Sequence, residues 1–90
     1  MPNTIMYALE QKGSIQFLLY LLKVGKTNFT EGRRNLKAVG QYAYRTAIGR
    51  LLDAQLIQEE TQTGFATPRI FSLTEKGEKI AKNLSEINGF

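Results

Sequence analysis

Apolar residues recur at helical spacing through the first quarter of the chain. They predict a short one-sided helix within residues 1–13, which Gly13 ends, and a second helix over residues 14–24. The second segment is apolar at nearly every position, so it has almost no polar face. A helix of this kind belongs in the centre of a domain, and Ser14 is a suitable N-cap for it.

The next segment contains polar and turn-forming residues that separate short elements. Residues 26–29 are typical of an extended connector, whose Phe29 points inward. Thr30 precedes an acidic residue and predicts the start of a short helix that ends at Leu36, since a hydroxyl caps free backbone N–H groups and an acid suits the first turn. Residues 37–40 then form a turn.

A longer one-sided helix is predicted over residues 41–55. Its apolar stripe follows the i, i+4, i+7, i+8 spacing and assigns four residues to the core: Tyr44, Ile48, Leu51 and Leu52. The opposite side is basic, aromatic and amide-rich, and it consists of Gln41, Tyr42, Arg45, Thr46, Gly49 and Arg50. The outward side therefore offers hydrogen-bond donors and acceptors.

After residue 56 the spacing changes from helical to alternating. Residues 57–63 and 69–73 are both predicted as strands, with a hairpin loop between them. Thr74 then caps a last helix within residues 74–90, whose first turn contains two acidic residues. The predicted order is therefore two helices, an extended segment, two further helices, a hairpin and a fifth helix.

The composition excludes most enzyme chemistry. Ninety residues, 42% of them hydrophobic, suffice for one small domain over residues 1–90, of the α+β class and mainly α. The chain has no His and no Cys, which excludes imidazole or thiolate metal sites, the nucleophilic dyads that use these groups, and disulfides. Its eight acidic residues show no acid/base pair. We therefore expect no enzyme, no metal and no cofactor.

Signals for a membrane or for export are also missing from the sequence. The longest uninterrupted apolar run, residues 17–22, is far shorter than the roughly 20 residues of a membrane-spanning helix. The first residues lack the basic segment before an apolar stretch that a secretory signal has. We therefore expect a cytoplasmic protein without a membrane partner.

Positive charge is concentrated in the middle of the chain. Residues 23–50 hold seven basic side chains and one acidic side chain, a net charge of +6, against +4 for the whole chain. Such asymmetry is the electrostatic footprint of a protein that binds a polyanion. A solvated basic face without a ligand is the alternative that charge alone leaves open.

Residues 44–57 and residues 71–81 together resemble the winged helix-turn-helix family, in the branch of small bacterial and archaeal transcription regulators of the MarR and PadR kind. Residues 44–57 (YRTAIGRLLDAQLI) resemble the recognition helix of that family and its exit into the wing. Residues 71–81 (FSLTEKGEKIA) resemble a wing strand that runs into a Leu-Thr-x-x-Gly helix start. Both segments occur in the order of the family, separated by a loop of wing length, and the resemblance spans roughly residues 14–84.

This resemblance implies a three-helix core with a β-hairpin wing over residues 14–73, the wing being residues 57–73. Terminal helices at residues 1–13 and 74–90 flank this core. The implied function is sequence-specific binding of double-stranded DNA by a repressor-like transcription regulator that acts as a homodimer.

Two residues depart from the family pattern. Gln55 stands where family members usually have Gly. Either the recognition helix leaves without the usual left-handed residue, or Gln55 adopts that conformation at some cost. Gly32 lies inside the preceding short helix, where glycine costs about 1 kcal/mol relative to alanine.

The resemblance also implies which residues contact DNA. Three residues of the recognition helix would present donors and acceptors to base edges: Gln41, Arg45 and Thr46. Three cations of the first helix and the turn would neutralise phosphates: Arg33, Arg34 and Lys37. Three small wing residues would approach a phosphate or the minor groove: Thr63, Gly64 and Thr67.

Other candidates have two or more interpretations. Arg69 resembles the basic residue that wing strands direct at the minor groove or the sugar-phosphate backbone. Tyr42 either stacks on a sugar or a thymine methyl group or covers the first helix. Arg50 has a structural or phosphate-binding role rather than a base-reading one. Phe65 inserts toward the groove, packs back on the hairpin or meets another protein.

Apolar stripes on the terminal helices predict the homodimer. The stripes consist of Ile5, Met6, Leu9, Ile80, Leu84 and Ile87. Packing them against a symmetry mate would bury them, whereas the alternative is that the first helix folds back on its own core. The sequence leaves a small-molecule effector undetermined.

A second function class stays open, namely a winged-helix module that binds proteins in a transcription or replication assembly. Such a module has no need for a concentrated positive charge, so the charge distribution favours DNA.

Overall fold

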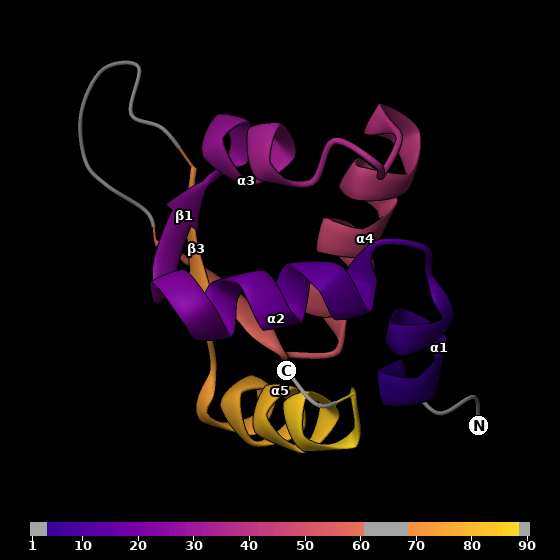
Figure 1. The fold of residues 1–90 in the computed structure, drawn as a ribbon, viewed down its shortest axis with the longest axis vertical. Helices are drawn as coiled ribbons and strands as arrows, with labels where there is room; N and C mark the ends of the chain where they lie inside the picture. The colour runs from indigo at the N-terminus through magenta and orange to yellow at the C-terminus, as the bar shows by residue number, and fades with distance from the viewer. Residues whose placement is uncertain (1–3, 61–68, 89–90) are drawn as a thin grey trace.

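The computed structural model describes residues 4–60 and 69–88, so the predictions for Thr63, Gly64, Phe65 and Thr67 lie outside the described residues. Within those ranges the chain forms five helices and a three-stranded antiparallel sheet (Figure 1). In chain order the elements are α1 (Thr4–Glu10), α2 (Ser14–Val24), β1 (Lys26–Asn28), α3 (Phe29–Asn35), α4 (Gln41–Asp53), β2 (Ile57–Glu60), β3 (Ile70–Leu73) and α5 (Glu75–Asn88). The predicted α+β, mainly α class is confirmed.

The sheet contains one strand more than the predicted hairpin. Its order is β1-β3-β2, and both pairings are antiparallel. Thr27 and Glu59 lie opposite Phe71 on its two sides. Of the connector predicted at residues 26–29, residues 26–28 are extended as expected, whereas Phe29 already belongs to α3. Residues 26–28 are also an edge strand that pairs with a segment more than 40 residues later.

Helix α2 occupies the centre of the molecule, as its apolar pattern predicts (Figure 1). The ring of Phe17 contacts Tyr44 of α4 and Phe71 of β3 edge-on, with centroid distances of 5.7 Å and 6.1 Å. The predicted stripe of α4 also faces this core, since Tyr44, Ile48 and Leu51 are buried and Leu52 is half-buried. One aromatic cluster therefore joins the central helix, α4 and the sheet.

Two predicted helix caps are wrong. Ser14 lies in the first turn of α2, where Gly13 occupies the N-cap position with φ 94°. The Ser14 hydroxyl is buried and has no hydrogen-bond partner among the described residues. Helix α3 begins at Phe29, because the Asn28 side chain accepts a hydrogen bond from the Glu31 N–H (2.7 Å). A cap residue has an extended backbone, and Asn28 has one as the last residue of β1.

The two departures from the family pattern have structural explanations. A Cβ at Gly32 would collide with the hydroxyl of Tyr44 and lie 3.2 Å from the Phe17 ring. Glycine is therefore required for the close approach of α3 to the core, which compensates for its low helix propensity. Gln55 has a φ of 61°, so it takes the left-handed conformation at the end of α4. This is the second of the two alternatives that the sequence left open for this residue.

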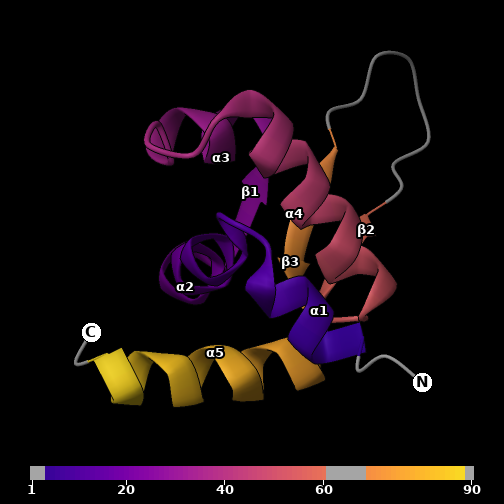
Figure 2. The ribbon, with the colours of Figure 1, turned by 90° about the vertical axis from the view of Figure 1, so that its right-hand side faces the viewer.

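The terminal helices lie at the end of the molecule opposite α3 (Figure 2). Helix α1 packs on α4 and α2, and α5 packs along α2. Four residues of the predicted dimer stripes are half-buried against the core: Ile5, Leu9, Ile80 and Leu84. Met6 and Ile87 are 52% and 78% exposed. In residues 4–60 and 69–88, no helix has the length and apolarity to cross a membrane.

Candidate nucleic-acid interface

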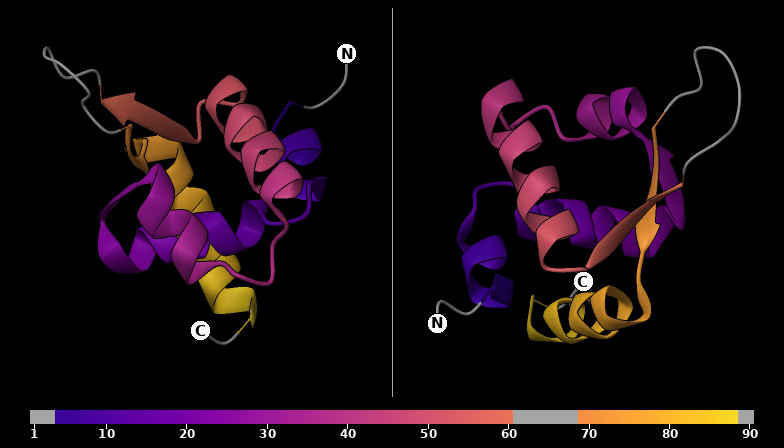
Figure 3. Two further views of the ribbon diagram at one scale, coloured as in Figure 1. Left: turned by 90° about the horizontal axis from the view of Figure 1, so that it is seen from above. Right: turned by 180° about the vertical axis from the view of Figure 1, so that it is seen from behind.

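Helix α3, the start of α4 and the outer ends of β2 and β3 gather at one end of the molecule (Figures 1 and 2). Seen from this end, α3 and α4 lie in front and β2 runs to one side (Figure 3, left). The tertiary fold thus brings the predicted recognition helix, the helix before it and the base of the wing to one surface.

The N-terminal half of α4 presents polar side chains to solvent. Gln41, Tyr42 and Arg45 are exposed, whereas Thr46 is half-buried. Tyr42 is 84% exposed, so it does not cover the first helix. The helix backbone starts after Gly40, whose extended conformation lets the chain turn out of the α3–α4 connection. These side chains are therefore available to a ligand at this end of the molecule.

The cations of α3 and the following turn differ in their surroundings. Arg33 is half-buried, and Lys37 is exposed. Arg34 is exposed and its Nη1 lies 3.7 Å from Oε2 of Glu31, one helical turn before it. Within the described residues, no ion pair involves Arg33, Lys37 or Arg45. This part of the surface consequently has uncompensated positive charge.

Phe29, the first residue of α3, contacts α4 and so links the two helices of this surface. Its ring packs edge-on against Tyr44 with a centroid distance of 4.9 Å, and the Tyr44 hydroxyl donates to the Phe29 carbonyl (2.9 Å). The guanidinium carbon of Arg45 lies 5.2 Å from the centre of the Phe29 ring, within cation–π range. Burial raises the pKa of Tyr44 to about 12, so this hydroxyl is neutral at physiological pH.

Arg69, the residue directly before β3, forms a two-pronged ion pair with Glu59 of β2. Arg69 Nε lies 2.9 Å from Glu59 Oε2, and Nη2 lies 3.0 Å from Oε1. The hydrogen bonds from Arg69 lower the pKa of Glu59, and the same hydrogen bonds raise the pKa of Arg69. Sequence analysis missed Glu59, because only the register of β2 against β3 brings residues 59 and 69 together.

Arg50 lies on the side of α4 that faces α1. Its guanidinium carbon is 3.8 Å from the centre of the Tyr7 ring, and its Nη1 donates to the Tyr7 carbonyl (3.4 Å). Arg50 therefore anchors α1 to α4, which agrees with the structural one of its two expected roles. Tyr7 was not singled out by the sequence analysis.

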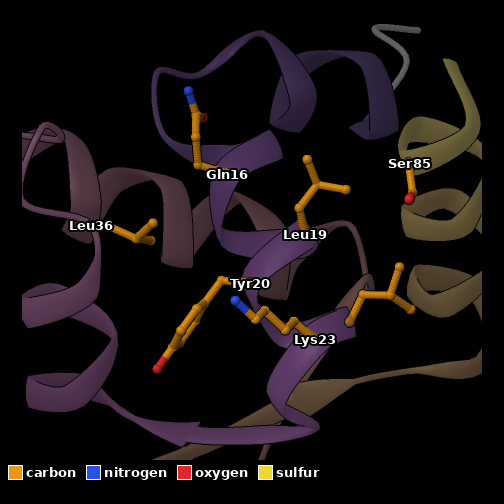
Figure 4. A pocket seen from close by; sticks show the side chains of 7 residues that line it. Gln16, Leu19, Tyr20, Lys23, Leu36 and Ser85 are labelled. Atoms are coloured by element: carbon orange, nitrogen blue, oxygen red, sulfur yellow. The ribbon is translucent and has the colours of Figure 1, made fainter. Parts of the chain in front are cut away.

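A hollow of about 540 Å³ lies away from this surface, between α2, the residue after α3 and α5 (Figure 4). Leu19, Leu22 and Leu36 make most of its lining apolar, and Lys23 and Tyr20 lie at its side (Figure 4). Asn35 holds the Tyr20 hydroxyl by a hydrogen bond of 3.1 Å. Among the described residues, no cluster of three or more carboxylates could hold a metal ion.

Comparison with known proteins supports the fold. No protein-family model and no curated protein sequence matches this chain. A solved structure from Porphyromonas gingivalis W83, described as a transcriptional regulator of the MarR family, superposes with a TM-score of 0.76. The two sequences are 20% identical, and the match covers 94% of this chain and 82% of the other. The chain therefore has the winged-helix fold of that protein.

Proposed function

We propose that this chain is a transcription regulator that binds double-stranded DNA in a sequence-specific, repressor-like manner as a homodimer. The observation that supports this most is the group of cations without ion pairs on α3 and α4, at the end of the molecule that a helix-turn-helix fold turns to DNA. The described function of the structurally similar P. gingivalis protein points in the same direction.

Helix α4 would lie in the major groove, with its N-terminal residues at the base edges. Arg45 would donate to guanine, and Gln41 would pair with adenine. Thr46, which is half-buried, would contribute one further contact to a base edge. Tyr42 is exposed enough to stack on a sugar or to touch a thymine methyl group.

Phosphate contacts would come from the cations around α4. Arg33, Arg34 and Lys37 lie on α3 and the turn, where the first helix of such a motif crosses the DNA backbone. Arg69 would reach the backbone from the wing, and so would Thr63, Gly64 and Thr67, which lie outside the described ranges. Arg50 would act indirectly, because it holds α4 against α1.

The dimer would form through the terminal helices. Met6 and Ile87 are exposed apolar residues at the end of the molecule away from α3, next to the half-buried remainder of their stripes. A second copy related by a two-fold axis would cover both residues and place two α4 helices about 34 Å apart, one turn of DNA. The operator would then be an approximate inverted repeat.

A protein-interaction module is the second candidate, and the exposed Tyr42 is the observation that favours it. Aromatic side chains are enriched in protein interfaces, and 84% exposure leaves this ring open to any partner. This candidate explains less, because an aromatic anchor does not require the surrounding cations.

Selection of duplexes from a random pool by the purified chain, followed by titration at several salt concentrations, tests the proposal. We expect enrichment of an inverted repeat and an affinity for it about 10³-fold or more above that for random duplex. Failure to enrich any sequence, together with a weak and fully salt-dependent affinity, would contradict sequence-specific regulation.

A further inference from the structure

Glu59 and Arg69 meet on the face of the sheet that packs against the helices. Glu59 lies opposite Phe71 in the antiparallel register, and Phe71 is completely buried in the core. Residues opposite each other in a sheet share a face, so Glu59 and Phe71 have the same orientation. The Arg69 side chain follows this face, since its guanidinium carbon lies 5.0 Å from the centre of the Phe71 ring.

The guanidinium groups of Arg69 and Arg45 both lie over the ring of Phe29, which we call the Phe29 platform. The guanidinium carbons of Arg69 and Arg45 lie 5.9 Å and 5.2 Å from the centre of the Phe29 ring. One cation thus comes from the residue before β3 and the other from α4. Only Arg69 has a carboxylate partner, because Arg45 forms no ion pair in the described ranges. The pairing with Glu59 therefore distinguishes two otherwise neighbouring guanidinium groups.

The next residue, Glu60, makes a different kind of pair. Glu60 accepts from Lys26 Nζ at 2.6 Å, through a single oxygen and on the opposite face of the sheet. The two side chains are 39% and 63% exposed. Adjacent strand residues point to opposite faces, so Lys26 and Glu60 lie away from Arg45 and Phe29. The chain thus offers a matched control carboxylate one residue from Glu59.

We propose that Glu59 competes with the DNA phosphates for Arg69 and thereby lowers the affinity of the protein for duplex DNA. This inference rests on the proposed function. Glu59 occupies Arg69 Nε and Nη2, one of the two edges through which a guanidinium makes a two-pronged contact with a phosphate, and it neutralises the charge of Arg69. A phosphate gains this edge of Arg69 and its unneutralised charge by displacing the carboxylate, and the freed Glu59 then repels the DNA backbone.

Cognate and random duplexes differ in how readily their phosphates displace Glu59 from Arg69. On random DNA the protein is held by phosphate contacts alone, and it slides among registers. Exchange of Glu59 for a phosphate has little net benefit there, so the ion pair stays closed. On the cognate site, base contacts from Arg45 fix the register, and Arg69 shares the Phe29 platform with Arg45. A phosphate is then held beside Arg69, which favours the exchange.

The test compares Glu59→Gln with Glu60→Gln, two variants that remove the same charge from adjacent residues. Binding of each to the selected site and to a random duplex is titrated by fluorescence anisotropy at several salt concentrations. We expect Glu59→Gln to raise affinity for random duplex about fivefold and to steepen its slope of log K against log salt by about one. Affinity for the selected site should rise at least as much, because the wild-type protein must break the same ion pair to form that complex. Glu60→Gln, which leaves the Glu59–Arg69 pair intact, should change both affinities and the salt slope less.

A double variant assigns the effect to Arg69. In an Arg69→Gln background, Glu59→Gln should no longer steepen the salt slope on random duplex. Equal effects of Glu59→Gln and Glu60→Gln, or an effect that persists without Arg69, would overturn the inference alone. If the wild-type chain prefers no sequence at all, the proposed function itself fails, which is a distinct outcome. Circular dichroism of each variant verifies that the fold is retained.

Discussion

The backbone of Gly77, in the first turn of α5, lies directly against the carbonyl group of Leu56, which follows α4. A Cβ at residue 77 would overlap that carbonyl oxygen. Around this contact, Thr74 donates to the Gln55 carbonyl (2.6 Å) and accepts from the Gly77 N–H (3.0 Å). Lys76 Nζ donates to the Ala54 carbonyl (3.1 Å). The end of α4 and the start of α5 are thereby joined, and the Thr-x-x-Gly spacing has a steric cause.

Substitution of Gly77 by Ala should therefore destabilise the domain. A methyl group has no room against a backbone carbonyl, and overpacking of this kind costs about 1–3 kcal/mol. Gly49→Ala is the matched control, since nothing lies within 4 Å of a Cβ there and alanine favours a helix by up to about 1 kcal/mol. Thermal unfolding followed by circular dichroism should show a lower melting temperature for Gly77→Ala and an equal or higher one for Gly49→Ala. The same direction for both would contradict the steric argument.

Arg45→Ala should reduce sequence discrimination. Arg45 is exposed on α4, and a base-edge contact contributes about 1–3 kcal/mol to the cognate complex only. Anisotropy titrations should show weaker binding to the selected site with little change on random duplex. Equal losses on both duplexes would assign Arg45 to the DNA backbone instead.

Lys37→Ala should weaken binding to every duplex alike. This lysine is exposed in the turn between α3 and α4 and has no ion pair in the described ranges. A phosphate can therefore bind its ammonium group without displacing a carboxylate. The slope of log K against log salt should fall by about one. Lys79→Ala, on α5 at the other end of the molecule, is the control and should leave the slope as it is. An unchanged slope for Lys37→Ala would remove this residue from the interface.

Ile87→Glu should convert the dimer into a monomer. Ile87 is 78% exposed in the single chain, so a carboxylate there leaves the fold of one subunit intact, but it would be buried without a partner in a dimer. Leu84 is half-buried against its own core, so Leu84→Glu would disturb the monomer as well. Sedimentation equilibrium at tens of micromolar should give a dimer for the wild-type chain and a monomer for Ile87→Glu. A monomeric wild-type chain would exclude the proposed assembly.

The stability of the fold should depend on Tyr44 at high pH. Burial raises the pKa of the Tyr44 hydroxyl from 10.0 to about 12, so the folded state favours the neutral form. The contribution of this hydroxyl to the free energy of unfolding is complete below pH 10 and is lost as the pH rises toward 12. The reason is that Tyr44 releases its proton at a lower pH in the unfolded chain than in the folded one. Tyr44→Phe should remove this part of the decline, and loss of its hydrogen bond to Phe29 should cost about 1 kcal/mol at neutral pH. Urea unfolding at pH 8 and at pH 10.5 measures both effects. A decline of the same size in Tyr44→Phe would show that other groups cause it.

The sequence by itself determined the order and the type of the main elements. The stripe of Tyr44, Ile48 and Leu51 is a local repeat with a period near 3.6, and each of these residues is buried. The Thr74 cap likewise depends on residues within one turn, and it is present. Both features could be predicted because neighbours in the chain are sufficient to define them.

Only the tertiary structure decided which distant residues meet. Residues 26–28 became a strand because β3 lies beside them, and Asn28 rather than Thr30 became the cap because β1 ends there. Gly32 is required because the Tyr44 hydroxyl approaches it from another helix. At the candidate interface, the residues of α4 could be named from periodicity, whereas the Glu59–Arg69 pair and the Arg50–Tyr7 contact could not. Strand register and helix packing set these contacts across 10 and 43 residues, and no local pattern encodes such distances.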